Sequence, residues 1–161
     1  MLYRHSSQLA LQAALLLAAE DSGKPRRVRD LAAALNVPAT YLAKVLQGLI
    51  RVGLLRTVRG PGGGVRLARP AREIRLWDVL EAVEPAGELE GCCLGLKEWS
   101  DRSPCPLHDA WARIRSQILA MLQSRSLWDF ATGARGRGLM TGSVGSGDGV
   151  EPEHTSVELP R

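Results

Sequence analysis

The chain has 161 residues, 45% hydrophobic and 24% charged, so it can bury one compact core with small appendages but not a second large core. Its longest apolar run, residues 13–19, is far too short to span a bilayer, and no basic segment with a small-residue cleavage site precedes it, so a cytoplasmic protein is expected. The net charge of +4 hides an asymmetry, because residues 1–75 carry a net +9 and the remainder a net −5. A basic N-terminal half is typical of nucleic-acid binders, although a solvated arginine-rich surface has the same composition.

Three helices are predicted in the first third of the chain. Apolar residues recur at helical spacing over residues 9–20, with Ser6 and Ser7 as candidate caps. A second helix is expected over residues 28–35, and a turn containing a proline leads into a third over residues 39–51. The order helix, short turn, helix is typical of a helix-turn-helix unit.

The third predicted helix has a polar face that carries Thr40, Tyr41, Lys44 and Gln47. Hydroxyl, ammonium and amide groups can hydrogen-bond base edges and phosphates, so this face is predicted to enter a DNA groove. The alternative is that Thr40 caps the helix and Lys44 is only solvated. Tyr41 is expected to lie partly in the core and partly against a phosphate.

Two short β-like runs follow, over residues 54–58 and 64–68, and the turn between them is rich in glycine. This pattern predicts a hairpin, or wing. Glycines such as Gly60 permit positive φ angles and close approach to a partner. The guanidinium groups of Arg59 and Arg66 suit phosphate or minor-groove contacts. The turn lacks the Gly-Lys-Ser/Thr ending of a nucleotide phosphate loop and no helix follows it at once, which argues against nucleotide binding.

The sequence predicts an organisation in four segments. Residues 1–84, ending in a helix over 76–84, form the winged helix-turn-helix domain, and residues 85–106 form a sensor-like loop without clear periodicity. Residues 107–131 contain a long amphipathic helix to residue 123, expected to pair with a second copy, and a short docking helix over 126–131. Residues 132–161 are rich in Gly, Ser, Thr, Pro and Glu and are expected to be disordered.

The three cysteines, Cys92, Cys93 and Cys105, lie close together, and His108 follows them. They are too few for a secreted disulfide scaffold and suggest metal or redox chemistry in a reducing compartment. Three alternatives stay open. These four residues ligate a [2Fe–2S] cluster or a metal ion, the thiols respond to oxidants through a disulfide or sulfenate, or the loop holds no ligand.

In chain order, the segments PATYLAKVLQGLIRVGLLRTVRGPGGGVRLARP, LWDVLEAVE and CCLGLKEWSDRSPCPLH resemble the Rrf2 family of bacterial winged-helix regulators over residues 1–131. The resemblance implies a mainly α fold with a small β-hairpin wing and a long C-terminal dimerisation helix. It also implies a homodimeric transcriptional regulator, usually a repressor, that binds a pseudo-palindromic operator in double-stranded DNA. Arg59 would then lie in the minor groove and residues 40–47 in the major groove.

Cluster-binding members of that family carry three spaced cysteines, often a histidine after the third, and commonly an acidic ligand from the first helix of the partner subunit. The matching positions in this chain are Cys93, Cys105 and His108. Trp99 stands at the middle cysteine position, and Gln8, a poor iron ligand, stands at the acidic position. The resemblance therefore implies a [2Fe–2S] cluster only if Cys92 replaces the missing thiolate.

Two other function classes compete with a DNA-binding regulator. A thiol oxidoreductase would use Cys92 with Cys93, or Cys105 with His108, but the sequence has no supporting acid at a defined spacing and no βαβ pattern. A winged helix devoted to protein contacts is disfavoured by the arginines of the wing. The chain is expected not to be an enzyme, and the open question is whether residues 92–108 make the regulator responsive to redox or iron–sulfur status or give it no input at all.

Overall fold

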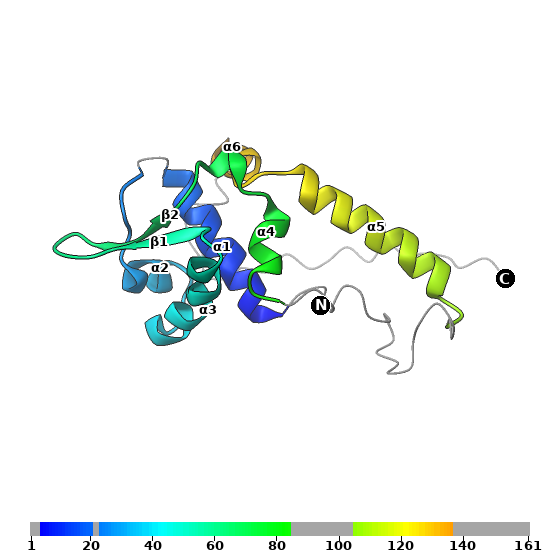
Figure 1. The fold of residues 1–161 in the computed structure, drawn as a ribbon, viewed down its shortest axis with the longest axis horizontal. Helices are drawn as coiled ribbons and strands as arrows, with labels where there is room; N and C mark the ends of the chain where they lie inside the picture. Colours follow the sequence, from blue (N-terminus) through cyan, green and yellow to red (C-terminus); the bar gives the residue numbers. More distant parts are fainter. Residues whose placement is uncertain (1–3, 21–22, 85–104, 137–161) are drawn as a thin grey trace, which may run out of the picture.

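The computed structural model describes residues 4–20, 23–84 and 105–136, and in these ranges the chain is mainly helical with one two-stranded hairpin, as predicted (Figure 1). The elements in chain order are α1 (His5–Glu20), α2 (Val28–Ala34), α3 (Ala39–Arg51), β1 (Leu55–Val58), β2 (Gly64–Leu67), the 3-10 helix η1 (Ala71–Glu73), α4 (Leu76–Glu81), α5 (His108–Ser124) and α6 (Leu127–Gly136). Across the described ranges, every helix is too short or too polar to span a lipid bilayer.

Helix α1 lies at the centre of the fold, and α3, α4, β2 and α6 all pack against it. It begins at His5, earlier than predicted, so the expectation that Ser6 and Ser7 cap it from outside is wrong. Ser7 is fully buried, and its hydroxyl donates to a carboxylate oxygen of Glu84. The same oxygen accepts the backbone N–H of Arg4 at 2.8 Å. Because α1 has no acidic residue in its own first turn, Glu84 supplies the acceptor and the negative charge that a helix N-terminus favours.

Helices α2 and α3 form the predicted helix-turn-helix. Asn36 takes a positive φ of 53° in the turn, a conformation that asparagine tolerates better than most residues. The N-cap of α3 is Pro38, and no side chain caps this helix, so the alternative that Thr40 is its cap is wrong. The apolar side of α3 is buried and holds the helix against the core. Gly53, two residues after the end of α3, has a positive φ of 74°, which is typical of a glycine that follows a helix C-terminus.

The wing is an antiparallel pair in which Leu55 lies opposite Leu67 and Arg56 opposite Arg66. The connection between α1 and α2 adds a third short segment to this pair. Arg26 N–H donates to the Val65 carbonyl at 2.9 Å, and Val65 N–H donates to the Arg26 carbonyl at 2.8 Å. Gly64 allows this close approach, because a Cβ there would overlap the Arg26 carbonyl group. The base of the wing is therefore anchored to the body of the domain.

Of the two C-terminal helices, α5 projects from the body of the domain and α6 packs against it. Figure 1 shows α5 extending away from the other helices, whereas α6 packs on α1 and η1. Ser126 and Asp129 hydrogen-bond each other's backbone N–H groups at the start of α6. Helix α6 continues to Gly136, beyond the docking helix predicted to end at residue 131, and α4 ends at Glu81, before the predicted residue 84. Residues 85–104, most of the predicted sensor-like loop, and 137–161, the rest of the predicted disordered tail, lie outside the described ranges.

Candidate nucleic-acid interface

One face of α3 gathers the four polar residues that the sequence singled out. Thr40, Tyr41, Lys44 and Gln47 are all exposed, whereas the leucine and valine residues between them are buried. Thr40, Lys44 and Gln47 are four and three positions apart and therefore share one side of the helix. Buried leucines hold α3 in place, so this polar face is presented on a rigid element.

An aromatic contact joins this face to the start of α1. The rings of His5 and Tyr41 stack with centroids 6.4 Å apart and planes 11° from parallel, and Tyr41 keeps 40% of its surface exposed. Sequence reasoning missed His5, because no local pattern connects residues 36 positions apart. His5 thus extends the α3 face with a second group that can meet a phosphate.

The wing presents Arg59 and Gly60 at its turn, and both are exposed. Gly60 has a φ of 95°, which a residue with a side chain rarely adopts, so glycine is needed for the chain to reverse directly after Arg59. Figure 1 shows the hairpin extending from the end of the molecule that also carries α2 and α3. The structure therefore leaves the Arg59 guanidinium and the α3 face available to one extended partner.

Arg66 has a different environment from the other predicted DNA contacts. It is half-buried at the base of the wing, and its Nη1 donates to the Gly23 carbonyl at 3.1 Å. Arg66 also lies directly opposite Arg56, which is on the neighbouring strand β1. The structure thus separates Arg66 from the exposed set formed by α3 and the wing turn.

The charge of this region has one sign. Residues 39–69, which include α3 and the whole wing, contain no Asp or Glu. The exposed cations of α3 and the wing turn are Lys44, Arg51 and Arg59. A surface with uncompensated cations attracts the phosphate backbone of a nucleic acid and makes binding sensitive to salt.

Only two of the four candidate metal ligands lie within the described ranges. Cys105 and His108 stand at the start of α5, where His108 N–H donates to the Cys105 carbonyl oxygen at 2.9 Å. Cys92, Cys93 and Trp99 lie outside those ranges, and Gln8 is a half-buried amide in α1. Across the described residues, no three His, Cys, Asp or Glu side chains are grouped so that they could hold a metal ion. The described part of the chain therefore offers a thiol and an imidazole, which is half of the donor set of a [2Fe–2S] cluster.

Comparison with known proteins gives three consistent results. The profile of the Rrf2 family, described as iron-dependent transcriptional regulators, matches residues 3–133. A Mycobacterium tuberculosis protein assigned as an HTH-type transcriptional regulator is 34% identical, with 80% of each chain covered, and the HTH-type transcriptional regulator IscR of Vibrio parahaemolyticus is 28% identical over 76% of this chain and 73% of its own length. CymR, the global cysteine regulator of B. subtilis, has the same fold, with a TM-score of 0.66 at 24% identity over 80% of this chain and 95% of the CymR chain.

Proposed function

The chain belongs to the Rrf2 family of DNA-binding transcriptional regulators, which are not enzymes, and on that basis we propose that it binds a pseudo-palindromic operator as a homodimer in the cytoplasm and represses transcription. The observation that carries this proposal is the exposed polar face of α3 beside a wing without acidic residues. Each subunit would place α3 in the major groove of one half-site and the wing turn in the adjacent minor groove.

The proposed contacts follow from the chemistry of the exposed groups. The Lys44 ammonium, the Gln47 amide and the Thr40 hydroxyl can hydrogen-bond base edges or phosphates. The Arg59 guanidinium suits a narrow minor groove, where the negative potential is enhanced, and Gly60 lets the wing backbone come close to the duplex. Tyr41, stacked on His5, is proposed to contact the phosphate backbone.

The proposed dimer contact is an apolar row formed by α5 and its N-cap residue Leu107. Leu107, Trp111, Ile114, Ile118 and Met121 recur at alternating spacings of four and three, the pattern of a coiled-coil seam. Leu107, Ile114 and Met121 are 46%, 50% and 57% exposed in the single chain. Within the described ranges, α5 reaches the core at its C-terminal end, through Leu122 and Ile118. Because large apolar side chains along a projecting helix favour burial, a second α5 is the proposed partner.

The DNA contacts are tested by Arg59→Ala and Lys44→Ala, with Arg113→Ala as a control that removes an equal charge from α5. Operator fragments are first selected from genomic DNA by gel shift. Arg59→Ala is expected to weaken operator binding by about 1–3 kcal/mol and to lower the slope of log K against log salt by about 0.9. No preference for any genomic fragment, or an equal effect of Arg113→Ala, would contradict the proposed interface.

The dimer is tested by Ile114→Glu, with Gln117→Glu as a control on the exposed polar side of the same helix. Sedimentation equilibrium is expected to show a dimer for the wild type and for Gln117→Glu, and a shift toward monomer for Ile114→Glu, because a charge cannot be buried unpaired in an apolar seam. A dimer of unchanged stability in Ile114→Glu would place the subunit contact elsewhere.

We also propose that residues 92–108 carry a redox or iron–sulfur input, with Cys92, Cys93, Cys105 and His108 as its groups. Since Cys105 and His108 adjoin the start of α5, a chemical change there would act on the helix that sets the spacing of the two α3 helices. Anaerobic purification with a visible spectrum and iron analysis distinguishes a cluster from a thiol switch. The proposed input is contradicted if the protein is colourless and free of iron and if its operator affinity is the same in oxidising and reducing buffer. The double variant Cys93→Ala, Cys105→Ala would then also leave operator affinity unchanged.

A further inference from the structure

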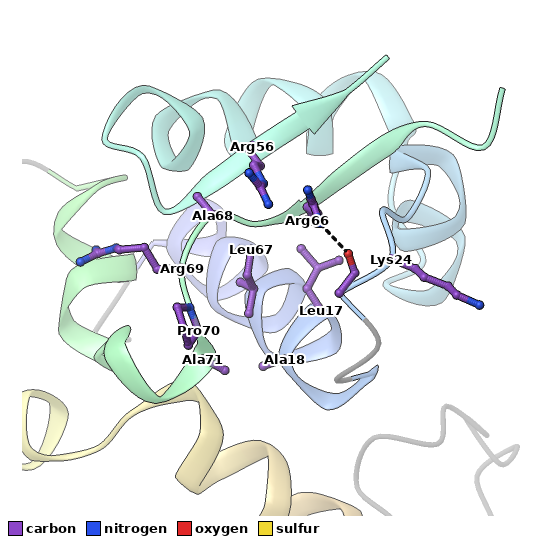
Figure 2. A pocket seen from close by; sticks show the side chains of 11 residues that line it. Leu17, Ala18, Lys24, Arg56, Arg66, Leu67, Ala68, Arg69, Pro70 and Ala71 are labelled. Atoms are coloured by element: carbon purple, nitrogen blue, oxygen red, sulfur yellow. Dashed lines mark hydrogen bonds between the residues drawn. The ribbon is translucent and has the colours of Figure 1, made fainter. Parts of the chain in front are cut away.

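A pocket of about 310 Å³ lies at the base of the wing, between the end of α1, both strands and the segment that leads into η1 (Figure 2). Its volume is at the lower end of the range of ~300–1,000 Å³ that is typical of small-molecule sites. No residue of α3 or of the wing turn lines it. The pocket is therefore distinct from the proposed DNA-binding surface on α3 and the wing turn.

Among the residues that the structure describes, the pocket is lined by four cationic side chains and by no acidic one. These side chains are Lys24, Arg56, Arg66 and Arg69. Figure 2 shows Arg56 and Arg66 on adjacent strands, with Lys24 and Arg69 toward opposite ends of the site. Glu20, near the end of α1, forms an ion pair with Arg26 at 2.7 Å and does not line the pocket.

Arg56 and Arg66 are directly opposite each other in the antiparallel register. Like charges in that position destabilise a strand pair unless a counter-charge is present. Within the described ranges, no carboxylate lies in salt-bridge range of either guanidinium. Among the described residues, the fold therefore concentrates the charges of Arg56 and Arg66 at one concave position without a carboxylate to neutralise them.

Arg66 is held in place but keeps unused donor capacity. Its Nη1 is fixed by the Gly23 carbonyl, drawn as a dashed line in Figure 2. Its Nε is buried and makes no hydrogen bond to any residue that the structure describes. Buried N–H donors are rarely left without an acceptor, so the described residues leave this guanidinium with hydrogen-bonding capacity that an anion can use.

The remaining lining is apolar and includes Leu17, Leu67 and Pro70. Cationic donors beside an apolar wall fit a molecule that has an anionic group on an apolar body. We propose that this pocket binds a small organic anion, with a carboxylate or phosphate held by Arg56 and Arg66 and its apolar part on Leu17 and Leu67. Because both wing strands line the site, the ligand acts on the position of the wing, and its binding is coupled to that of DNA.

Calorimetric titration of the full-length protein at matched ionic strength tests the site with phenylphosphate, benzoate, inorganic phosphate and phenol. One molecule of phenylphosphate or benzoate is expected per chain, and the tighter of the two identifies the preferred anionic group. Inorganic phosphate should bind more weakly than phenylphosphate, and phenol should not bind. Arg56→Gln and Arg66→Gln are expected to weaken binding by about tenfold or more, since each removes a charge-assisted hydrogen bond.

Arg29→Gln is the matched control, because Arg29 is exposed, carries the same charge and does not line the pocket. Arg66→Gln also removes the hydrogen bond to Gly23, so the exposed Arg56 keeps the test decisive if that variant fails to fold. The proposal is overturned if neither organic anion shows saturable binding, if inorganic phosphate binds as tightly as phenylphosphate, or if Arg29→Gln weakens binding as much as Arg56→Gln. It is also overturned if Arg56→Gln leaves anion binding unchanged but lowers operator affinity and its salt dependence, because the pocket cations would then contact DNA phosphates. Operator affinity that is equal with and without saturating phenylphosphate would remove the coupling.

Discussion

Replacing Gly64 by alanine tests how the wing is attached to the body of the domain. A Cβ at this position would overlap the Arg26 carbonyl group and lie 2.8 Å from the Arg27 nitrogen. All of these atoms belong to the backbone, so no side-chain rotation relieves the overlap. The Arg26 segment must then move away from β2, and the two hydrogen bonds between Arg26 and Val65 are lost.

The expected cost combines two contributions. Two backbone hydrogen bonds contribute about 1 kcal/mol each, and overpacking adds about 1–3 kcal/mol, for a total of roughly 3–5 kcal/mol. A domain of this size has a free energy of unfolding of about 5–15 kcal/mol, so the variant is expected to fold but to be markedly less stable. The wing would also lose its anchor, and operator affinity should fall with it.

Gly53→Ala is the matched control for this substitution. A Cβ at Gly53 meets no atom within 4 Å, so the substitution costs only the strain of a positive φ of 74°, about 1–2 kcal/mol. Urea unfolding, monitored by circular dichroism, gives both differences if the slope of the free energy against urea is unchanged. A cost for Gly64→Ala no larger than that for Gly53→Ala would refute the reasoning, because the backbone approach would then not limit this position.

Two further substitutions test contacts that join distant parts of the chain or begin a helix. Glu84→Ala removes the acceptor of the Arg4 N–H and of the Ser7 hydroxyl, and it is expected to lower the free energy of unfolding by about 1–3 kcal/mol. Glu84→Gln keeps an acceptor, so its loss should be smaller. Equal stability of the wild type and both variants would contradict this role of Glu84. The pKa of Asp129 is lowered by hydrogen bonds from the Ser126 backbone N–H and hydroxyl and by the nearby Arg125 and Arg75. Its ionised form therefore stabilises the folded state above the usual carboxyl pKa of about 4, and this stabilisation is lost as the pH falls through the lowered value. Wild type should be more stable than Asp129→Asn near neutral pH, and the difference should disappear in acid; a difference that is constant with pH would exclude the charge as its cause.

The local sequence determined most of the secondary structure and the α3 part of the candidate nucleic-acid interface. Hydrophobic periodicity identified the helices, and the residues that end them, such as Asn36 and Gly53, adopt the positive φ that their position requires. The exposed face of α3 followed from the same periodicity, because residues three and four apart share a side of a helix. These features depend only on residues that are close in the sequence.

The tertiary structure decided the features that depend on residues far apart. Helix α1 begins at His5 because Glu84 accepts hydrogen bonds from the Arg4 N–H and the Ser7 hydroxyl at its N-terminal end. Tyr41 stacks on His5, 36 positions earlier in the chain. Arg66 had the same sequence signal as Arg59, yet its contact with Gly23 and its position opposite Arg56 place it in the pocket. Such contacts leave no periodic trace in the sequence, because the packing of separate elements brings the groups together.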